Sequence, residues 1–327
     1  MTSAWTAIRT IAAKEVTGAR RTSLLLVITS FMLLAGLVAL VVAALALHDE
    51  VTTYNDARAL LLSLGKPASS IASPTFVPLK LLRGFIEYIE IIGAVLGIVL
   101  GYRAAAIERG RNTLALILTR PLTQTALIGG KLLGNLALIV MVLTATFALG
   151  AVGIMLIGGV ALSLDEMLRL VLTALAAILF VTIFFVLGFA LALRMRRLPQ
   201  ALLAAFSLWL VLVLIAPQIG DTMDPDNQVP GGVFRTLGIP KPEEKAILAS
   251  FKTYETIRDS IEQASPAKHF ERWSFALTGI KETFIGQSVA AVMIDRITNL
   301  LWLLGDLAVL LALLFLPRLD FTRLTKE

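Results

Sequence analysis

The chain has 327 residues, of which 57% are hydrophobic and 16% are charged, and its mean hydropathy is +0.84. Soluble domains carry about 25% charged residues, so this composition excludes an ordinary soluble protein and indicates several membrane-spanning segments. The net charge of +6 is, in a membrane protein, first a signal of topology and not of nucleic-acid binding. Cysteine is absent, which excludes disulfides, thiolate metal sites and cysteine nucleophiles.

Six apolar runs are long enough to cross a bilayer, since about 20 helical residues cover a hydrocarbon core of roughly 30 Å. They lie at 24–47, 84–106, 133–158, 168–193, 198–219 and 298–317. All are continuously apolar, which excludes the alternating strands of a β-barrel and predicts an all-α membrane protein. The first run is too long for a signal peptide, so we interpret it as an uncleaved span. Glycines recur at 93–101 and 150–159 and predict close helix packing.

The basic residues predict the orientation of these spans. Fifteen of them fall in segments that share one side of the membrane, and five fall in the two short segments of the other side. By the positive-inside rule, both termini are cytoplasmic in a multi-pass protein of the plasma or inner membrane. We therefore divide the chain into a cytoplasmic interfacial helix (1–23), a five-span region (24–216), an extracytoplasmic segment (217–297), and a sixth span with a cytoplasmic tail (298–327).

Two segments are expected outside the bilayer on the extracytoplasmic side. The larger, 217–297, opens with turn-forming residues and continues with a helical pattern over 241–263. We expect it to be a helical cap on the bundle, with a docking surface for an extracytoplasmic partner protein as the alternative. The smaller, 48–83, contains the stretch SLGKPASSIASP, whose glycine, proline and serine content predicts irregular chain. His48 and His269 have no partner at metal-ligand spacing and are expected to be interfacial or solvated.

Three carboxylates fall within the predicted spans. Asp306 lies near the middle of the last span, where an ionisable group is either functional or a hydrogen-bonded helix contact. Glu87 and Glu90 share a helical face near the outer end of the second span, and Arg83 can reach Glu87 at i,i+4. The two glutamates either line an outer vestibule or sit at the level of the lipid headgroups.

The cytoplasmic segment after the second span, 107–131, is built unlike a plain connector. A short apolar helical stretch at 113–119 is broken by Arg120-Pro121, and Thr123 can cap the helix that follows. An apolar helix exposed to the cytoplasm needs the membrane surface or another protein to cover it. No GxxxxGK[ST] motif occurs, so we do not expect the chain itself to hydrolyse nucleotide by that route.

The region before the first span is the second unusual cytoplasmic segment. Over 5–20, apolar side chains recur at helical intervals between basic residues, which predicts an amphipathic helix at the cytoplasmic interface. This region contains the sequence KEVTGARR, with Lys14, Glu15, Arg20 and Arg21.

Together, these two segments resemble the permease subunits of type-2, export-type ABC transporters. In that family a KE…R segment precedes the first span, and a loop of the form E-x-G-T-x-x-L-L-x-x-P-x-x-R-x-x-x-x-x-G-K follows the second. The loop is matched here by Glu108, Gly110, Thr113, Leu114, Leu116, Leu118, Pro121, Gly130 and Lys131. The chain departs from the pattern where Arg111 and Asn112 are inserted and where Gln124 replaces a basic residue. The plan looks closest to the permeases of nitrous-oxide-reductase copper-site maturation and of gliding motility.

The resemblance implies a homodimeric, non-catalytic membrane subunit coupled to separate ATP-binding subunits. The ATPase-coupling residues that it implies are Glu108, Arg109, Gly110, Arg111, Thr113, Arg120 and Pro121, with Lys14, Glu15, Arg20 and Arg21 on the interfacial helix. The loop arginines either pair with acidic groups of the ATPase or only fix the orientation. We expect no cofactor or metal in this chain, ATP and Mg²⁺ in the partner, contact with the lipid bilayer, and no nucleic acid. The alternatives are an integral membrane enzyme that modifies lipid and a scaffold for an extracytoplasmic assembly.

Overall fold

The computed structural model describes residues 4–71, 76–110, 123–159, 161–224, 229 and 232–315. Every regular element within these ranges is helical, which confirms the all-α prediction. Six helical segments there are long and apolar enough to cross a membrane, in agreement with the six apolar runs of the sequence.

The helices of the bundle are α1 (Ala4–Arg20), α2 (Ser23–Ser63), α3 (Arg83–Tyr88), α4 (Ala94–Gly110), α6 (Gln124–Gly158), α7 (Leu164–Arg194), α8 (Leu198–Trp209), α9 (Ala216–Met223) and α14 (Val289–Phe315). Between α9 and α14 lie α10 (Val233–Thr236), α11 (Lys241–Ser250), α12 (Lys252–Gln263), α13 (Pro266–Leu277) and the 3-10 turn η6 (Glu282–Phe284). The π-helical turns η3 (Ile89–Gly93) and η4 (Leu210–Ile215) join α3 to α4 and α8 to α9. The 3-10 turns η1 (Ala68–Ser70) and η2 (Pro78–Leu82) precede α3.

The local sequence explains several helix ends. Ser163 and Glu166 form a capping box at the start of α7, in which the Glu166 backbone N–H donates to Ser163 Oγ at 3.2 Å and the Ser163 backbone N–H donates to Glu166 Oε2 at 2.7 Å. The Ala126 backbone N–H donates to Thr123 Oγ1 at 3.2 Å and starts α6, as predicted. After the last turn of α6, Gly159 adopts the left-handed conformation with φ 63°, which ends the helix.

The centre of the bundle is the contact between α4 and α7. A Cβ atom on Gly97 would lie 2.5 Å from the carbonyl oxygen of Val181, and one on Gly188 would lie 2.6 Å from that of Ile98. Gly101 approaches the backbone of α7 just as closely. Any larger residue at these positions would push the helices apart, so the glycines serve helix packing, as the sequence predicts.

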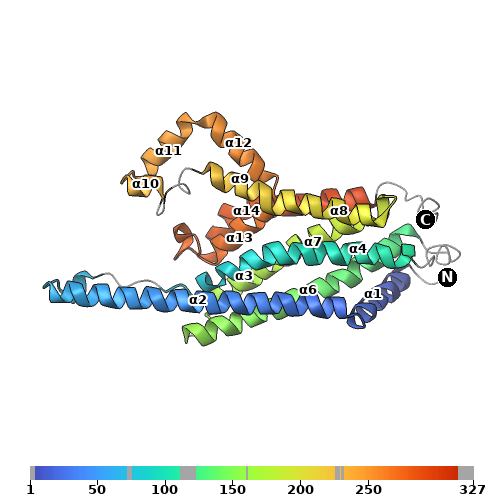
Figure 1. Cartoon of the computed structure of the whole chain (residues 1–327), viewed down its shortest axis with the longest axis horizontal. Coiled ribbons are helices and arrows are strands. Elements are labelled where there is room, and N and C mark those ends of the chain that lie inside the picture. The colour runs from blue at the N-terminus through green and yellow to red at the C-terminus, as the bar shows by residue number, and fades with distance from the viewer. Residues whose placement is uncertain are drawn as a thin grey trace.

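Two helices extend beyond the apolar runs. The first spanning helix, α2, continues to Ser63, so the first part of the predicted outer segment is helical and projects past the bundle (Figure 1). The last, α14, begins at Val289 and not near 298. Hydropathy marks only the part of a helix that contacts apolar surroundings, whereas the backbone hydrogen bonds continue through the polar turns on either side.

The short helix α13 enters the bundle instead of lying above it. The Phe270 ring stacks on Phe180 of α7, with 5.0 Å between centroids, and Ser265 Oγ donates to the carbonyl oxygen of Leu212 at 2.5 Å. Trp273 and Phe275 are also buried. These aromatic residues therefore belong to the core.

The bundle has two different ends. We call the one where α1 meets the end of α4 and the start of α6 the N-terminal end, and the one that carries α10 to α13 the distal end (Figure 1).

Candidate functional site

Polar residues from three helices meet at the N-terminal end. Lys14 and Glu15 come from α1, Glu108 from the end of α4, and Lys131 and Asn135 from the start of α6. Glu108 Oε1 lies 3.1 Å from Lys14 Nζ and 3.2 Å from Lys131 Nζ, and Lys131 Nζ lies 2.8 Å from Glu15 Oε1. The Asn135 side-chain amide donates to the carbonyl oxygen of Lys131 at 2.9 Å and to Glu15 Oε2 at 3.5 Å. We call these five residues the junction cluster.

The charges of the junction cluster are largely withdrawn from solvent. The side chain of Lys131 is 2% exposed and that of Glu108 is 6% exposed. Buried charges persist only when they are paired, and removing one partner leaves the other uncompensated. Two ammonium groups alternate here with two carboxylates, so the cluster fixes α1, α4 and α6 relative to one another.

Glycines allow α1 to lie close enough to α6 for these contacts. A Cβ atom on Gly130 would lie 2.7 Å from the Cβ of Ile11, and one on Gly134 would lie 2.8 Å from the carbonyl oxygen of Ala12. The two glycines are four residues apart and share a face of α6. This close approach brings Glu15 against Lys131.

Arg109 extends the junction to α7. Its Nη1 donates to the carbonyl oxygens of Ala192 at 2.7 Å and Met195 at 2.8 Å, and its Nη2 donates to that of Arg196 at 2.7 Å. A cation at the C-terminal end of a helix satisfies carbonyl groups that have no partner within the helix and complements the helix dipole. The Arg109 guanidinium is thus engaged inside the protein, not directed outward to an acidic partner.

The remaining predicted coupling residues are only partly described. Gly110 is the last residue of α4, and Arg20 and Arg21 are exposed where α1 ends. Arg111, Thr113, Arg120 and Pro121 lie outside the described residues. The structure describes the helices on both sides of the segment 111–122. The end of α4 contributes Glu108 to the junction cluster, and the start of α6 contributes Lys131 and Asn135.

The two glutamates of the second span do not share a face. Glu87 is exposed and pairs with Arg83, with 3.0 Å between Oε1 and Nε, as predicted. Glu90 is buried, with 8% of its surface exposed. The wider π-helical turn of η3 begins at Ile89, between the two glutamates, and changes the direction in which the following residues point. The two glutamates, which were predicted to share a helical face, therefore differ in their exposure.

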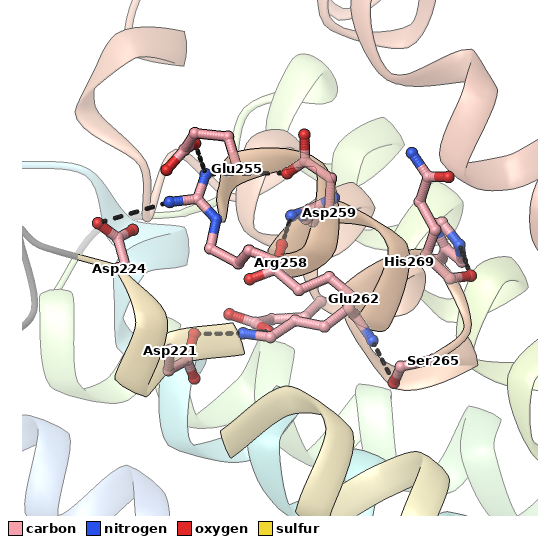
Figure 2. Close-up of polar contacts among 12 residues, drawn as sticks. Asp221, Asp224, Glu255, Arg258, Asp259, Glu262, Ser265 and His269 are labelled. Carbon is pink, nitrogen blue, oxygen red and sulfur yellow. Dashed lines mark hydrogen bonds and ion pairs between the residues drawn. The ribbon is translucent and has the colours of Figure 1, made fainter. Parts of the chain in front are cut away.

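His269 also differs from its prediction. It is buried, its Nδ1 lies 3.1 Å from Asn299 Oδ1, and its Nε2 lies 3.0 Å from the carbonyl oxygen of Gln263 (Figure 2). Its ring stacks on Trp302, with 5.6 Å between centroids. Asp306, one turn further along α14, is partly buried and lies within electrostatic reach of His269. The prediction of a solvated imidazole is wrong because α13 folds into the bundle.

Comparison with known families decides what kind of protein carries this junction. A family model described as "ABC-2 family transporter protein" matches residues 9–323, a range that begins within α1 and includes the junction cluster and all six spans. The chain belongs to the ABC-2 transporter family. It is a multi-pass membrane protein and a transmembrane permease of an ABC transporter. No curated protein sequence matches the permease significantly.

Sequence reasoning left two members of the junction cluster in this ABC-2 permease without a role. Lys131 was only a landmark of the loop pattern, and Asn135 was a polar residue at the edge of a span. Their signal was the spacing in GKLLGN, which places Gly130 and Gly134, and likewise Lys131 and Asn135, one helical turn apart. A helix that presents small residues beside paired polar residues is suited to close contact with another polar helix, here α1.

Proposed function

We propose that this permease is the membrane subunit of an ATP-driven transporter that exports a substrate or transmits force, and that a separate ATP-binding subunit docks on segment 111–122. The observation that supports it best is the junction cluster, because its ion pairs connect the two ends of this segment to each other and to α1, and the buried pairs do so through Lys131. A movement imposed on the segment would reach α4 and α6 directly and α1 through the cluster. Arg109 would carry the same movement to α7. Rigid helices that pivot in this way can transmit a docking motion across a bilayer.

In this proposal the N-terminal end faces the cytoplasm, as the positive-inside rule predicts. Arg20 and Arg21 at the end of α1, and Arg196 and Arg197 between α7 and α8, are exposed at this end. Such a basic surface suits both lipid headgroups and an acidic patch on an ATP-binding subunit.

We further propose that two copies of the permease assemble with two ATP-binding subunits. The spans formed by α2, by α8 with α9, and by α14 are the least buried within one chain. Their exposed apolar residues, such as Phe31 and Leu203, offer faces for a second copy as well as for lipid. The six-span plan with a large distal segment between the fifth and sixth spans supports a place near the nitrous-oxide-reductase maturation and gliding-motility permeases.

Purification of the tagged chain from its native membrane tests the coupling proposal. Mass spectrometry should identify an ABC-type ATPase in an amount equal to that of the permease, and light scattering should show two copies of each. Replacing Leu114 and Leu118 together by Asp should remove the ATPase, because the docked segment would lose its apolar contact, while the permease stays monodisperse. Leu60→Asp, on the exposed projecting part of α2, is the matched control and should retain the ATPase. Recovery of a monomeric permease without an ATPase contradicts the proposal.

A further inference from the structure

The N-terminal end contains a cavity beside the junction cluster that the proposed coupling function does not use. Its volume is about 420 Å³, a size typical of ligand pockets. It lies between α1, the turn that leads into α2, α4 and α6. Its charged lining residues are Lys14, Glu15, Arg21 and Arg103, and Asn135 also lies in its wall.

The cavity has an excess of positive charge. Among the described lining residues, Glu15 is the one carboxylate, and its two oxygens are engaged by Lys131 at 2.8 Å and by Asn135 at 3.5 Å. Lys14 pairs with Glu108 at 3.1 Å, but its side chain is 63% exposed, so further N–H donors of its ammonium group remain available. No carboxylate of this wall is left for the two arginines.

Arg103 and Arg21 lack a counter-charge in the part of the chain that the structure describes. There, neither side chain makes a hydrogen bond or an ion pair. Arg21 is exposed, whereas Arg103 is partly buried and lies six positions before Arg109 in the same span, about 9 Å further in at 1.5 Å per residue. An unpaired guanidinium is costly in apolar surroundings, and an anion in the cavity would relieve this cost.

The rest of the wall indicates the kind of anion. Between the charged groups the cavity is lined by small or apolar residues, namely Gly18, Ala19, Leu100, Ala104 and Ile107. Thr22 also lines it, and directly beyond Thr22 the first turns of α2 expose Leu26 and Val27. A small polar anion gains nothing from apolar surroundings, whereas a phospholipid carries its phosphate next to acyl chains that do.

We propose that this cavity binds the headgroup of an anionic phospholipid of the phosphatidylglycerol class, with its phosphate on Arg103, Arg21 and Lys14. Arginine and lysine donate charge-assisted hydrogen bonds to phosphate oxygens. The acyl chains lie along the exposed apolar start of α2, and the bound lipid connects α1 to α4 beside the junction cluster. A zwitterionic headgroup is disfavoured, because its ammonium group finds no unengaged carboxylate among the described lining residues. The proposal requires only that this end of the bundle lies at a membrane surface, so it does not rest on the coupling function.

Native mass spectrometry of the detergent-purified full-length chain tests the charge recognition. Phosphatidylglycerol and phosphatidylcholine of the same acyl length carry the same phosphate and differ in net charge, and each is titrated separately. We expect one phosphatidylglycerol to bind about tenfold more tightly than phosphatidylcholine. Arg103→Gln should abolish this preference. The matched control Arg9→Gln removes the same charge from an exposed position of α1 outside the cavity and should keep the preference.

A second pair of variants tests the cavity without changing any charge. A Cβ atom on Gly18 would meet nothing within 4 Å, so Gly18→Leu is compatible with the fold and adds a bulky side chain at the cavity wall. It should weaken the binding of phosphatidylglycerol about tenfold. Thr17→Leu adds the same side chain at the adjacent exposed position, outside the cavity, and should bind the lipid as the wild type does.

The outcomes separate the proposal from its alternatives. Equal binding of the two lipids, or an unchanged preference in Arg103→Gln, overturns the proposal and makes Arg103 a hydrated arginine. Loss of the preference in Arg9→Gln also contradicts it, because the attraction would then come from the overall charge of this end. Displacement of the lipid by glycerol phosphate at similar concentrations overturns the lipid assignment in favour of a soluble phosphate.

Two features keep the test decisive. If Arg103→Gln does not yield folded protein, Arg21→Gln and Gly18→Leu decide, because position 21 is exposed and position 18 has open space beside it. The experiment needs no ATPase, so its failure leaves the coupling proposal standing, and the reverse also holds.

Discussion

At the scale of single residues, burial and not distance decides how much an ion pair of the junction cluster contributes to the stability of the protein. Glu108 Oε1 lies 3.1 Å from Lys14 Nζ and 3.2 Å from Lys131 Nζ, so the two contacts have nearly the same geometry. The Lys14 side chain is 63% exposed, however, whereas that of Lys131 is 2% exposed. Solvent therefore screens the pair of Lys14 with Glu108, and water can hydrate Glu108 on that side when Lys14 is lost. Water cannot reach the pair of Lys131 with Glu108 in the same way.

Substitution of each lysine by methionine separates these two effects. Lys131→Met leaves the buried carboxylates of Glu15 and Glu108 short of a counter-charge and should destabilise the protein by about 3 kcal/mol. Lys14→Met should cost less than about 1 kcal/mol, because it removes an exposed partner from the same oxygen atom. The measurement is the temperature at which half of the detergent-solubilised protein loses its monodisperse gel-filtration peak. Equal losses in the two variants would show that the junction cluster is solvated.

The sequence predicts which residues matter at the junction better than it predicts their partners. Lys14, Glu15 and Glu108 stand out through the resemblance of their segments to a family pattern, yet no local spacing connects α1 to the end of α4. Glu90 was expected in an outer vestibule or among the headgroups because it lies near the end of a predicted span, and His269 was expected to be interfacial or solvated because it lies in the outer segment. The directions of their side chains depend on the π-turn η3 and on the entry of α13, which are tertiary features.

At the scale of elements, the existence of each span was predictable, but the full length of its helix and the path of the chain between spans were not. An apolar run identifies a helix that faces lipid or core, and all six runs correspond to helices. Hydropathy does not identify α13 as a buried helix, because its sequence, PAKHFERWSFAL, contains four charged or histidine residues in its first seven positions. Partners on α9 and α12 neutralise these charges, so a polar sequence becomes a buried helix. Such compensation between distant segments leaves no periodic signal.

The contact between α1 and α6 gives a prediction at this scale that depends on two adjacent glycines. A Cβ atom on Gly129 would meet Ile8 Cδ1 at 3.7 Å, an ordinary contact, whereas one on Gly130 would meet the Cβ of Ile11 at 2.7 Å. Gly130→Ala should therefore push α1 away from α6 and cost about 1–3 kcal/mol, a cost typical of overpacking. Gly129→Ala should be neutral or stabilising, because alanine is the better helix former.

Limited trypsin digestion measures the separation of these helices, because α1 contains Arg9, Lys14 and Arg20 as cleavage sites. Cleavage within α1 should accelerate in Gly130→Ala and stay at the wild-type rate in Gly129→Ala. Similar rates in all three proteins would mean that α1 does not depend on close packing against α6.

At the scale of the whole molecule, the second span connects the N-terminal end of the bundle to its distal end. It carries Glu108 and Arg109 at the N-terminal end and Glu90 at the distal end, and glycines hold its α4 part tightly against α7. A closely packed helix pair moves as one body, so a movement imposed at the junction would also reach the distal end of the second span. This arrangement follows from the fold and could not be predicted from the motifs, which cover only the N-terminal end of the bundle.

The orientation of the molecule provides the last prediction, and the absence of cysteine makes it direct to test. If the basic excess reflects the positive-inside rule, α1 lies in the cytoplasm and both the projecting part of α2 and α12 lie outside. Arg20→Cys, Lys66→Cys and Lys252→Cys each place one thiol at an exposed position. In intact cells, a membrane-impermeant maleimide should label the cysteines at 66 and 252, and it should label the one at 20 only after permeabilisation. Labelling of position 20 in intact cells would invert the topology and place the junction cluster on the side where no ATP-binding subunit can reach it.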